Sequence, residues 1–300
     1  MDRRQGAAAV RMRIVPLALF AILLTACAAP QGAGSSAAAS PGETPLTATF
    51  PSGEFGDPTT IDNPWLPMTP GTTWVWEGET LVDGEAVDHR IVSIVTDLTK
   101  VIDGVQTRAV YDRDYSGGEL IEAELLFLAQ DNAGTIWHLG QYPEEYENGE
   151  FIDSPGWIAG VAGALAGIWM PADPQVGQPD YSQGWGPAVG WTDRGRVVEA
   201  GVEDCVPVDC YSDVLVIEEW ALDHPEAKQL KYYARDVGNT RVGWSGSEEQ
   251  EQETLELVEF RQLTDAELQE ARAEALALDE RSYENLPHVF GETEPAQAGS

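Results

Sequence analysis

The sequence predicts a mainly β protein: a curved antiparallel sheet or partly open barrel, with a helix near the C-terminus packed on it. Two observations support this prediction. Short β-branched and aromatic runs recur between turn residues, and a single strong helix signal lies near the end of the chain. An α+β arrangement is the alternative.

The strand signals begin after the turn Thr69-Pro70-Gly71 and continue to residue 260. Further turn signals, Ile102-Asp103-Gly104 and Asp131-Asn132-Ala133-Gly134, separate neighbouring runs. Because few helical segments interrupt these runs, mainly antiparallel pairing is expected. The expected strands cover residues 72–77, 87–98, 101–111, 119–130, 135–139, 189–200, 211–222, 228–234 and 254–260.

One helix is expected over residues 264–283. Thr264 and Glu267 form a capping box, and Leu263 can pack on Leu268 across the cap. The shared apolar face of this helix consists of Leu268, Ala271, Ala275 and Leu278. The helix should cover one end or face of the sheet, and residues 286–300 are expected to form a loose tail.

The N-terminus carries the features of a secretory signal that ends at Cys27. Four arginines precede the uncharged run 14–23, which is shorter than the roughly 20 residues of a membrane span. Leu24-Thr25-Ala26-Cys27 resembles the cleavage site of a bacterial lipoprotein. We therefore predict a signal peptide over 1–26, a lipid such as palmitate on Cys27, and a place on the outer face of the bacterial cell membrane.

The segment that follows Cys27 differs in composition from the rest of the chain. Residues 27–48 are rich in Ala, Gly, Ser and Pro and contain one charged residue, Glu43. This composition predicts a flexible tether. Residues 49–285 are expected to form a single mainly β domain.

The charge of the chain limits its partners. The sequence has 17 Lys and Arg against 51 Asp and Glu. Cleavage before Cys27 would remove four Arg and one Asp, leaving 13 basic and 50 acidic residues and a net charge of −37 (13 − 50). Nucleic acid and anionic headgroups would be repelled. Divalent cations and basic molecules are possible ligands, although a solvated acidic surface is the simpler interpretation.

Two cysteines remain once Cys27 carries lipid. An oxidising compartment favours a disulfide between Cys205 and Cys210, which would close a short ring. A zinc site would need more thiol or imidazole ligands nearby, and none follows at a suitable spacing.

Ten tryptophans suggest either a large aromatic core or a ligand site for an apolar molecule or a sugar. Trp169 lies in the uncharged segment 154–172, whose glycines and prolines favour a buried or cavity-lining segment over a membrane span. The candidate ligand-binding residues are Trp74, Trp76, Trp137, His138 and Trp169, with core packing as the competing interpretation.

Acidic residues offer two weaker candidates. Asp112, Asp114 and Ser116 match the first half of a calcium loop, but Ala123 stands where the bidentate Glu belongs, so an acidic hairpin loop is the simpler interpretation and no metal is predicted. Glycoside chemistry needs paired carboxylates, and a solvated edge is the simpler interpretation of Glu144, Glu145, Glu147 and Glu150. No nucleophile turn, phosphate loop or dinucleotide fingerprint is present, and no cofactor is predicted.

Several segments together resemble a family of bacterial secreted and lipid-anchored proteins with no assigned activity. They lie at residues 61–67, 70–74, 129–137, 146–149, 167–172, 176–177 and 231–238. The chain departs from the family where Arg235-Asp236 replaces Pro-Gly. The resemblance implies one domain that spans these segments, and it offers no catalytic residues.

The sequence therefore predicts a membrane-anchored extracytoplasmic lipoprotein that binds a ligand or partner without catalysis. The alternatives are a cell-surface glycan hydrolase with paired carboxylates and a structural or regulatory envelope protein.

Overall fold

The structure is a computed structural model that describes residues 49–299 of the 300-residue chain. Cys27, the predicted signal peptide 1–26 and the predicted tether 27–48 lie outside the described residues.

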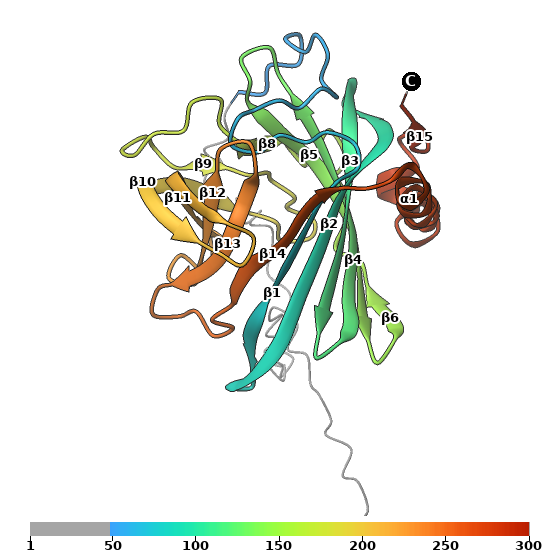
Figure 1. Cartoon of the computed structure of the whole chain (residues 1–300). Coiled ribbons are helices and arrows are strands. Elements are labelled where there is room, and N and C mark those ends of the chain that lie inside the picture. Colours follow the sequence, from blue (N-terminus) through green and yellow to red (C-terminus); the bar gives the residue numbers. More distant parts are fainter. Residues whose placement is uncertain (1–48, 300) are drawn as a thin grey trace, which may run out of the picture. The chain divides into compact units, whose positions relative to one another are not determined.

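Within residues 49–299, fifteen strands form one antiparallel sheet (Figure 1), whose main path runs β6-β5-β4-β3-β2-β1-β14-β13-β12-β11-β10-β9. The path ends at β6 and β9, so the sheet is open, and the predicted mainly β class is confirmed. The strands are β1 Thr72–Val82, β2 Glu85–Ile102, β3 Val105–Ser116, β4 Glu119–Gln130, β5 Ile136–Glu147, β6 Glu150–Asp153, β7 Trp157–Ile158, β8 Gly167–Met170, β9 Tyr181–Ser182, β10 Arg194–Cys205, β11 Cys210–Trp220, β12 Lys228–Ala234, β13 Gly238–Ser245, β14 Thr254–Gln262 and β15 Gln297–Ala298.

The sheet curves until its two halves, β1–β6 and β9–β14, face a common interior (Figure 1). We call the side of the sheet that faces this interior the inner face. Both halves contribute to one buried apolar cluster there. Its members include Val95, Val110, Leu126 and Leu128 from the first half and Leu215, Ile217, Tyr233 and Leu257 from the second.

The opposite side of β2–β5, which we call the helix face, forms a second apolar cluster. Successive side chains of a strand point to opposite sides. Leu126 and Leu128 therefore lie on the inner face, whereas Leu125 and Phe127 lie under the helix. Burial on both sides explains why residues 125–129 form an unbroken apolar run.

Helix α1, Asp265–Asn285, covers the helix face (Figure 1). The predicted capping box is confirmed: the N–H of Glu267 donates to Thr264 Oγ1 over 3.3 Å, and the N–H of Thr264 donates to Glu267 Oε2 over 2.8 Å. The buried side of the helix carries Ala271, Ala275, Leu278, Asp279 and Ser282.

The predicted loose tail is wrong for residues 286–299. Helix α2, Pro287–Phe290, follows α1, and β15 pairs with β2. Phe290 is fully buried between Tyr142, Phe127 and Tyr283. The large ring of Phe290 fills the helix face, and burying it fixes the segment in place.

Several strands of the structure are not predicted by the sequence. β13 was not predicted, because Gly238, Asn239 and Gly243 weaken its strand signal. It forms nevertheless because β12 and β14 pair with it on either side. The short strands β6 to β9 depend in the same way on longer neighbours, since β6, β7 and β8 all pair with β5.

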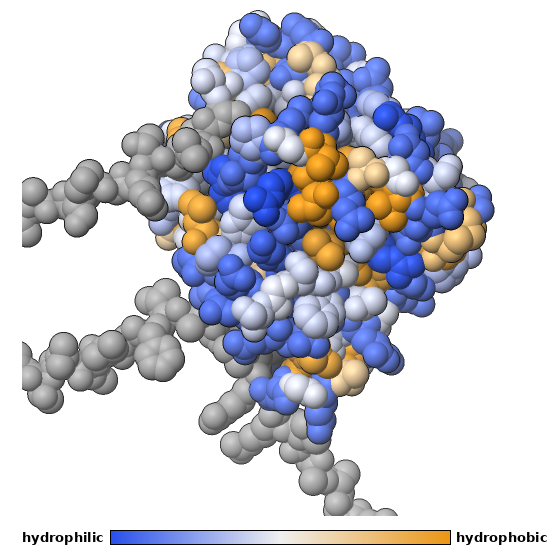
Figure 2. Space-filling model, turned by 90° about the vertical axis from the view of Figure 1, so that its left-hand side faces the viewer, coloured by the Kyte–Doolittle hydropathy of each residue, from blue (hydrophilic) through white to orange (hydrophobic). Residues whose placement is uncertain are grey.

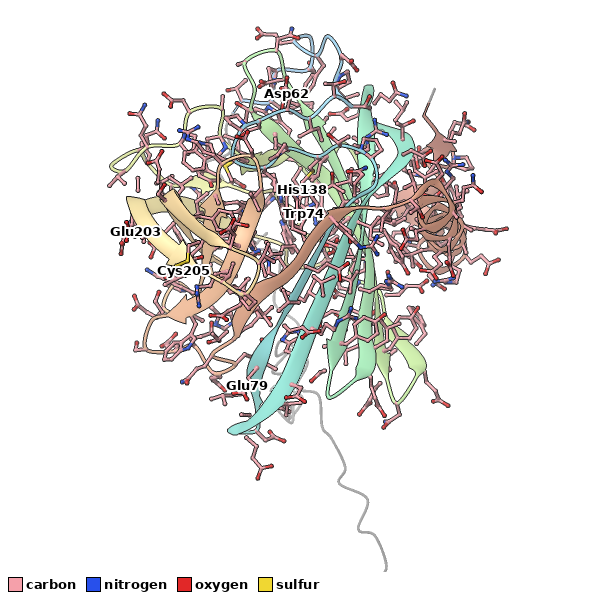
Figure 3. All side chains as sticks on the ribbon, viewed as in Figure 1. Asp62, Trp74, Glu79, His138, Glu203 and Cys205 are labelled. Carbon is pink, nitrogen blue, oxygen red and sulfur yellow. A yellow bond between two sulfur atoms is a disulfide. The ribbon has the colours of Figure 1, made fainter. Side chains whose placement is uncertain are left out.

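The predicted disulfide is present. Cys205 and Cys210 face each other across the β10–β11 hairpin, with their sulfur atoms 2.07 Å apart. Figure 3 shows Cys205 at the far end of β10.

A buried ion pair connects α1 to the sheet. Lys100 Nζ donates to Asp279 Oδ1 at 3.0 Å, to Tyr283 Oη at 2.6 Å and to the Glu294 carbonyl at 3.0 Å. Lys100 and Asp279 are almost completely buried. A buried ammonium is costly unless every donor is satisfied, so α1 and the C-terminal segment depend on each other.

We expect Asp279→Ala to lower the free energy of unfolding by about 3–5 kcal/mol, because it leaves the Lys100 ammonium buried without its counter-ion. The matched control is Arg261→Ala, which removes exposed ion pairs with Glu259 and Glu267 and should cost less than about 1 kcal/mol. Urea denaturation followed by circular dichroism measures both. A cost as small for Asp279→Ala as for the control would contradict this account.

Candidate functional site

Four carboxylates project from β3 and β4 toward the inner face. On β3, Asp112 and Asp114 lie two and four residues after Val110, which faces inward, so their side chains point to the same side. On β4, Glu122 and Glu124 lie four and two residues before Leu126, which also faces inward. We call these four residues the acidic cluster. Asp112 lies directly opposite Glu124 in the strand register, and Asp114 lies opposite Glu122.

The acidic cluster is partly exposed to solvent, unlike the apolar cluster beside it. Like charges directly opposite each other in an antiparallel pair are destabilising. Within residues 49–299, only Asp114 of the four has an ion-pair partner, since its Oδ1 lies 2.5 Å from His89 Nε2. The arrangement therefore crowds four acidic groups together, three of which have no counter-ion within residues 49–299.

Crowding changes the protonation of these groups. Burial raises the pKa of Asp112 to about 6, although a hydrogen bond from Ser93 and the charge of Lys231 oppose the shift. Burial and then repulsion by neighbouring carboxylates raise the pKa values of Glu122 and Glu124 above the usual range. Carboxyl groups with such pKa values are typical of functional sites.

His89 borders the acidic cluster as a cation. Its Nε2 lies 2.5 Å from Asp114 and its Nδ1 lies 3.0 Å from Glu253 Oε1. Burial by itself would lower the pKa of His89, but the hydrogen bonds to these two carboxylates and their charges raise it to about 10. His89 therefore carries a positive charge at neutral pH.

Lys231 reaches the inner face from β12, in the second half of the sheet. Its Nζ lies 2.8 Å from Glu219 Oε2 and 5.9 Å from the centre of the Trp169 ring. Its charge also acts on Asp112 and Glu124. Lys231 thus connects the acidic cluster to the aromatic residues beside it.

His138 lies in the interior between the two halves of the sheet, as does Trp74 (Figure 3). Three indole rings surround the imidazole of His138, those of Trp157, Trp169 and Trp191, with centroids 4.8–5.8 Å away. His138 Nδ1 lies 3.0 Å from the Gln183 carbonyl, so Nδ1 carries the proton and donates. Burial lowers the pKa of His138 to about 4, and the ring is neutral at physiological pH.

Several buried polar atoms on this side of the sheet have no hydrogen-bond partner among the described residues. They include the acceptors His138 Nε2, Gln141 Oε1 and Asp112 Oδ1, the donors Trp157 Nε1 and Trp191 Nε1, and the hydroxyl groups of Ser116 and Tyr181. Folded proteins pair nearly all such atoms, so each of these calls for an ordered water, an ion or a ligand as its partner.

The predicted ligand-binding residues do not form one site. The indole N–H groups of Trp74 and Trp76 are used within the fold, since they donate to the carbonyls of Val237 and Asn239. Trp137 lies on the helix face and donates to Asp131 Oδ2. The five residues therefore fall into separate groups: Trp74 stacks on Trp76 with ring centroids 6.4 Å apart, and His138 packs on Trp169 at 4.8 Å.

The three residues that match half of a calcium loop do not lie in a loop. Asp112, Asp114 and Ser116 lie within β3, and the hairpin turns at Gly117 and Gly118. Among residues 49–299, no three or more His, Cys, Asp or Glu side chains are grouped to hold a metal ion.

The predicted solvated edge is wrong for Glu144. This carboxylate is almost fully buried and accepts hydrogen bonds from Tyr142, Tyr146 and Arg281. The side chain of Glu144 lies on the helix face, and its ion pair with Arg281 connects the C-terminal half of α1 to β5.

The uncharged segment 154–172 supplies β7 and β8 beside β5. Two surface hollows border it, of about 230 and 420 Å³, both lined by Asp103 and Gly160. Neither hollow includes a residue of the acidic cluster. No helix within residues 49–299 is long and apolar enough to cross a membrane.

Residues 61–67, 129–137 and 167–172 meet in one network. The side-chain amide of Asn63 donates to the carbonyls of Gly134 and Pro171, 2.9 and 3.0 Å away. Arg235 lies over the ring of Trp65, 4.0 Å from its centre. These contacts support the folded chain and do not reach the acidic cluster.

No family model matches the chain, and no curated protein matches it. Two solved structures are similar to it at low identity. One is named as an exported protein with a YmcC-like fold from Bacteroides fragilis, with 10% identity over 66% of this chain and 99% of that one, and a TM-score of 0.39. The other is named as a lipoprotein from Parabacteroides distasonis, with 11% identity over 68% and 99%, and a TM-score of 0.35. Likenesses this distant carry no functional argument.

The acidic cluster was recognised only in part from the sequence. The sequence names Asp112 and Asp114 as weak metal candidates, and it singles out neither Glu122 nor Glu124. Alternating acidic residues on both arms of one hairpin were the available signal. No sequence pattern marks Lys231 as part of this site, because only the curvature of the sheet brings β12 to face β3 and β4.

Stability should fall as the pH rises from about 5 to 9. Between these values the folded protein keeps protons on Glu122, Glu124 and His89 that the unfolded chain has released. Glu122→Gln removes one such group, so it should raise the free energy of unfolding at pH 8 by about 1–2 kcal/mol and have little effect at pH 5. Thermal melting across this pH range, with the exposed Glu119→Gln as control, measures the difference. A pH dependence unchanged in Glu122→Gln would contradict it.

Proposed function

We propose that this protein is an extracytoplasmic lipoprotein, anchored through Cys27, that binds a small ligand on the inner face of its sheet. The signal-like N-terminus and the cysteine at its end support the anchor. The Cys205–Cys210 disulfide supports a location outside the reducing cytoplasm.

The observation that carries the binding proposal is the acidic cluster. Asp112, Glu122 and Glu124 make no ion pair within residues 49–299, yet they lie side by side on a partly exposed interior surface. Such an arrangement lowers stability. Its cost is offset when a ligand supplies the missing charges and hydrogen bonds.

Binding fits this surface better than catalysis does. His138, the imidazole nearest to the indole rings, is fully enclosed and neutral. The other imidazole, His89, is held between two carboxylates. Neither is free to transfer a proton at physiological pH.

Native mass spectrometry of the full chain, purified from its own membrane, tests both parts of the proposal. We expect a peptide from Cys27 to carry a lipid mass that Cys27→Ala lacks, and the folded protein to retain a small molecule. The double variant Asp112→Asn, Glu124→Gln should lose that molecule, whereas Glu119→Gln should keep it. An unmodified Cys27 would overturn the anchor, and a ligand-free mass in the wild type would overturn the binding function.

A glycan hydrolase is the second candidate, favoured by the direct opposition of Asp112 and Glu124. This candidate predicts that the protein releases reducing ends from purified cell-wall glycan, and that Glu124→Gln lowers the rate by at least about 100-fold. We expect no release above that of the Glu124→Gln variant. Release by the wild type alone would favour the enzyme.

A further inference from the structure

We infer that the ligand of the inner face is a linear organic cation with two ammonium groups, a diamine, held by the acidic cluster. This inference rests on the proposed binding function and specifies the chemical class of the ligand.

The charge of the surface selects a cation. Within residues 49–299, one cation of the protein pairs with the acidic cluster, His89 at Asp114, whereas Lys231 pairs with Glu219 outside the cluster. His89 is also shared with Glu253, and Lys231 influences Asp112 and Glu124 only from a distance. An anionic ligand would add repulsion to this surface.

Unpartnered buried atoms beside the cluster also call for hydrogen-bond donors. Gln141 is 5% exposed, and its Oε1 has no partner within residues 49–299. Gln141 lies on β5 directly opposite the inward-facing Leu126, next to the position of Glu124. Asp112 Oδ1 and the hydroxyl of Ser116, a residue that is 5% exposed on β3, are unpartnered as well. An ammonium group offers three N–H donors, which suits the amide and carboxylate oxygens.

The spacing of the cluster favours two ammonium groups. The pair Asp112–Glu124 and the pair Asp114–Glu122 occupy alternate positions of the same two strands. Alternate residues of a strand are about 7 Å apart. A short alkyl chain between two ammonium groups spans such a distance, so one ammonium can take the place of the proton that each carboxylate pair holds in the free protein.

Lys231 shows how an ammonium is accommodated here. Its Nζ is held by Glu219 at 2.8 Å and lies 5.9 Å from the centre of the Trp169 ring. Carboxylate and aromatic contacts of this kind are typical of ammonium recognition. A bare metal ion fits less well, because no three potential ligands among the described residues are grouped to hold one.

Isothermal titration of the purified protein with putrescine tests the inference. The comparison ligands are n-butylamine, which lacks the second ammonium, 1,4-butanediol, which lacks both charges, and calcium chloride and maltose as a metal and a neutral sugar. We expect putrescine to bind about tenfold or more tightly than n-butylamine, and butanediol not to bind.

Two variants assign the binding to the acidic cluster. Asp112→Asn with Glu124→Gln should weaken putrescine binding about tenfold or more, and the exposed Glu119→Gln should leave it unchanged. Melting curves of each variant verify folding. Should the double variant fail to fold, Gln141→Ala replaces it, with the same loss expected because one acceptor is removed.

The remaining outcomes distinguish the diamine as the ligand from the binding function on which it rests. Calcium or maltose binding that the double variant abolishes would overturn the diamine and keep the binding function. Equal binding of putrescine and n-butylamine would overturn the two-ammonium form. If no probe binds and the protein purified from its membrane retains no molecule, both claims fail.

Discussion

The apolar cluster between the two halves of the sheet is the constraint on which the rest of the structure depends. Val110 and Leu126 from one half pack in the same cluster as Leu215 and Leu257 from the other. Because this packing brings β3 and β4 to face β11 and β12, every ionisable residue on the same face enters a surface of restricted hydration. The raised pKa values of the acidic cluster and the confinement of Lys231 follow from that packing.

The two sides of β1–β6 differ in how their buried polar groups are paired. On the helix face, Lys100 and Glu144 are completely paired, the first with Asp279 and the second with Arg281. On the inner face, Asp112 and Glu124 are left without counter-ions within residues 49–299. This contrast within one sheet is the physical reason for assigning a stabilising role to the helix face and ligand binding to the inner face.

The outer surface shown in Figure 2 is mostly hydrophilic around a smaller group of apolar residues, as the acidic composition predicts.

The aromatic residues divide in a similar way. Trp74 and Trp137 complete the packing of the fold, and each donates its N–H to an oxygen of the protein. Trp157 and Trp191 surround His138 with their N–H groups unpartnered among the described residues. A tryptophan count cannot separate these roles, because packing and recognition use the same ring.

The sequence by itself determined the mainly β class, the strands from β1 to β5, the capped helix α1 and the Cys205–Cys210 pair, because alternation, capping and spacing are local. The export signal at Cys27 stays a prediction from the sequence, because it lies outside the described residues. Only the tertiary structure decided that β13 forms, that Phe290 is buried, and that the charge of Lys231 acts on Asp112. These depend on contacts between residues far apart in the chain, and on a curvature that no local pattern encodes. The candidate site belongs to this second group, since its carboxylates become a cluster only when β3 and β4 pair in register.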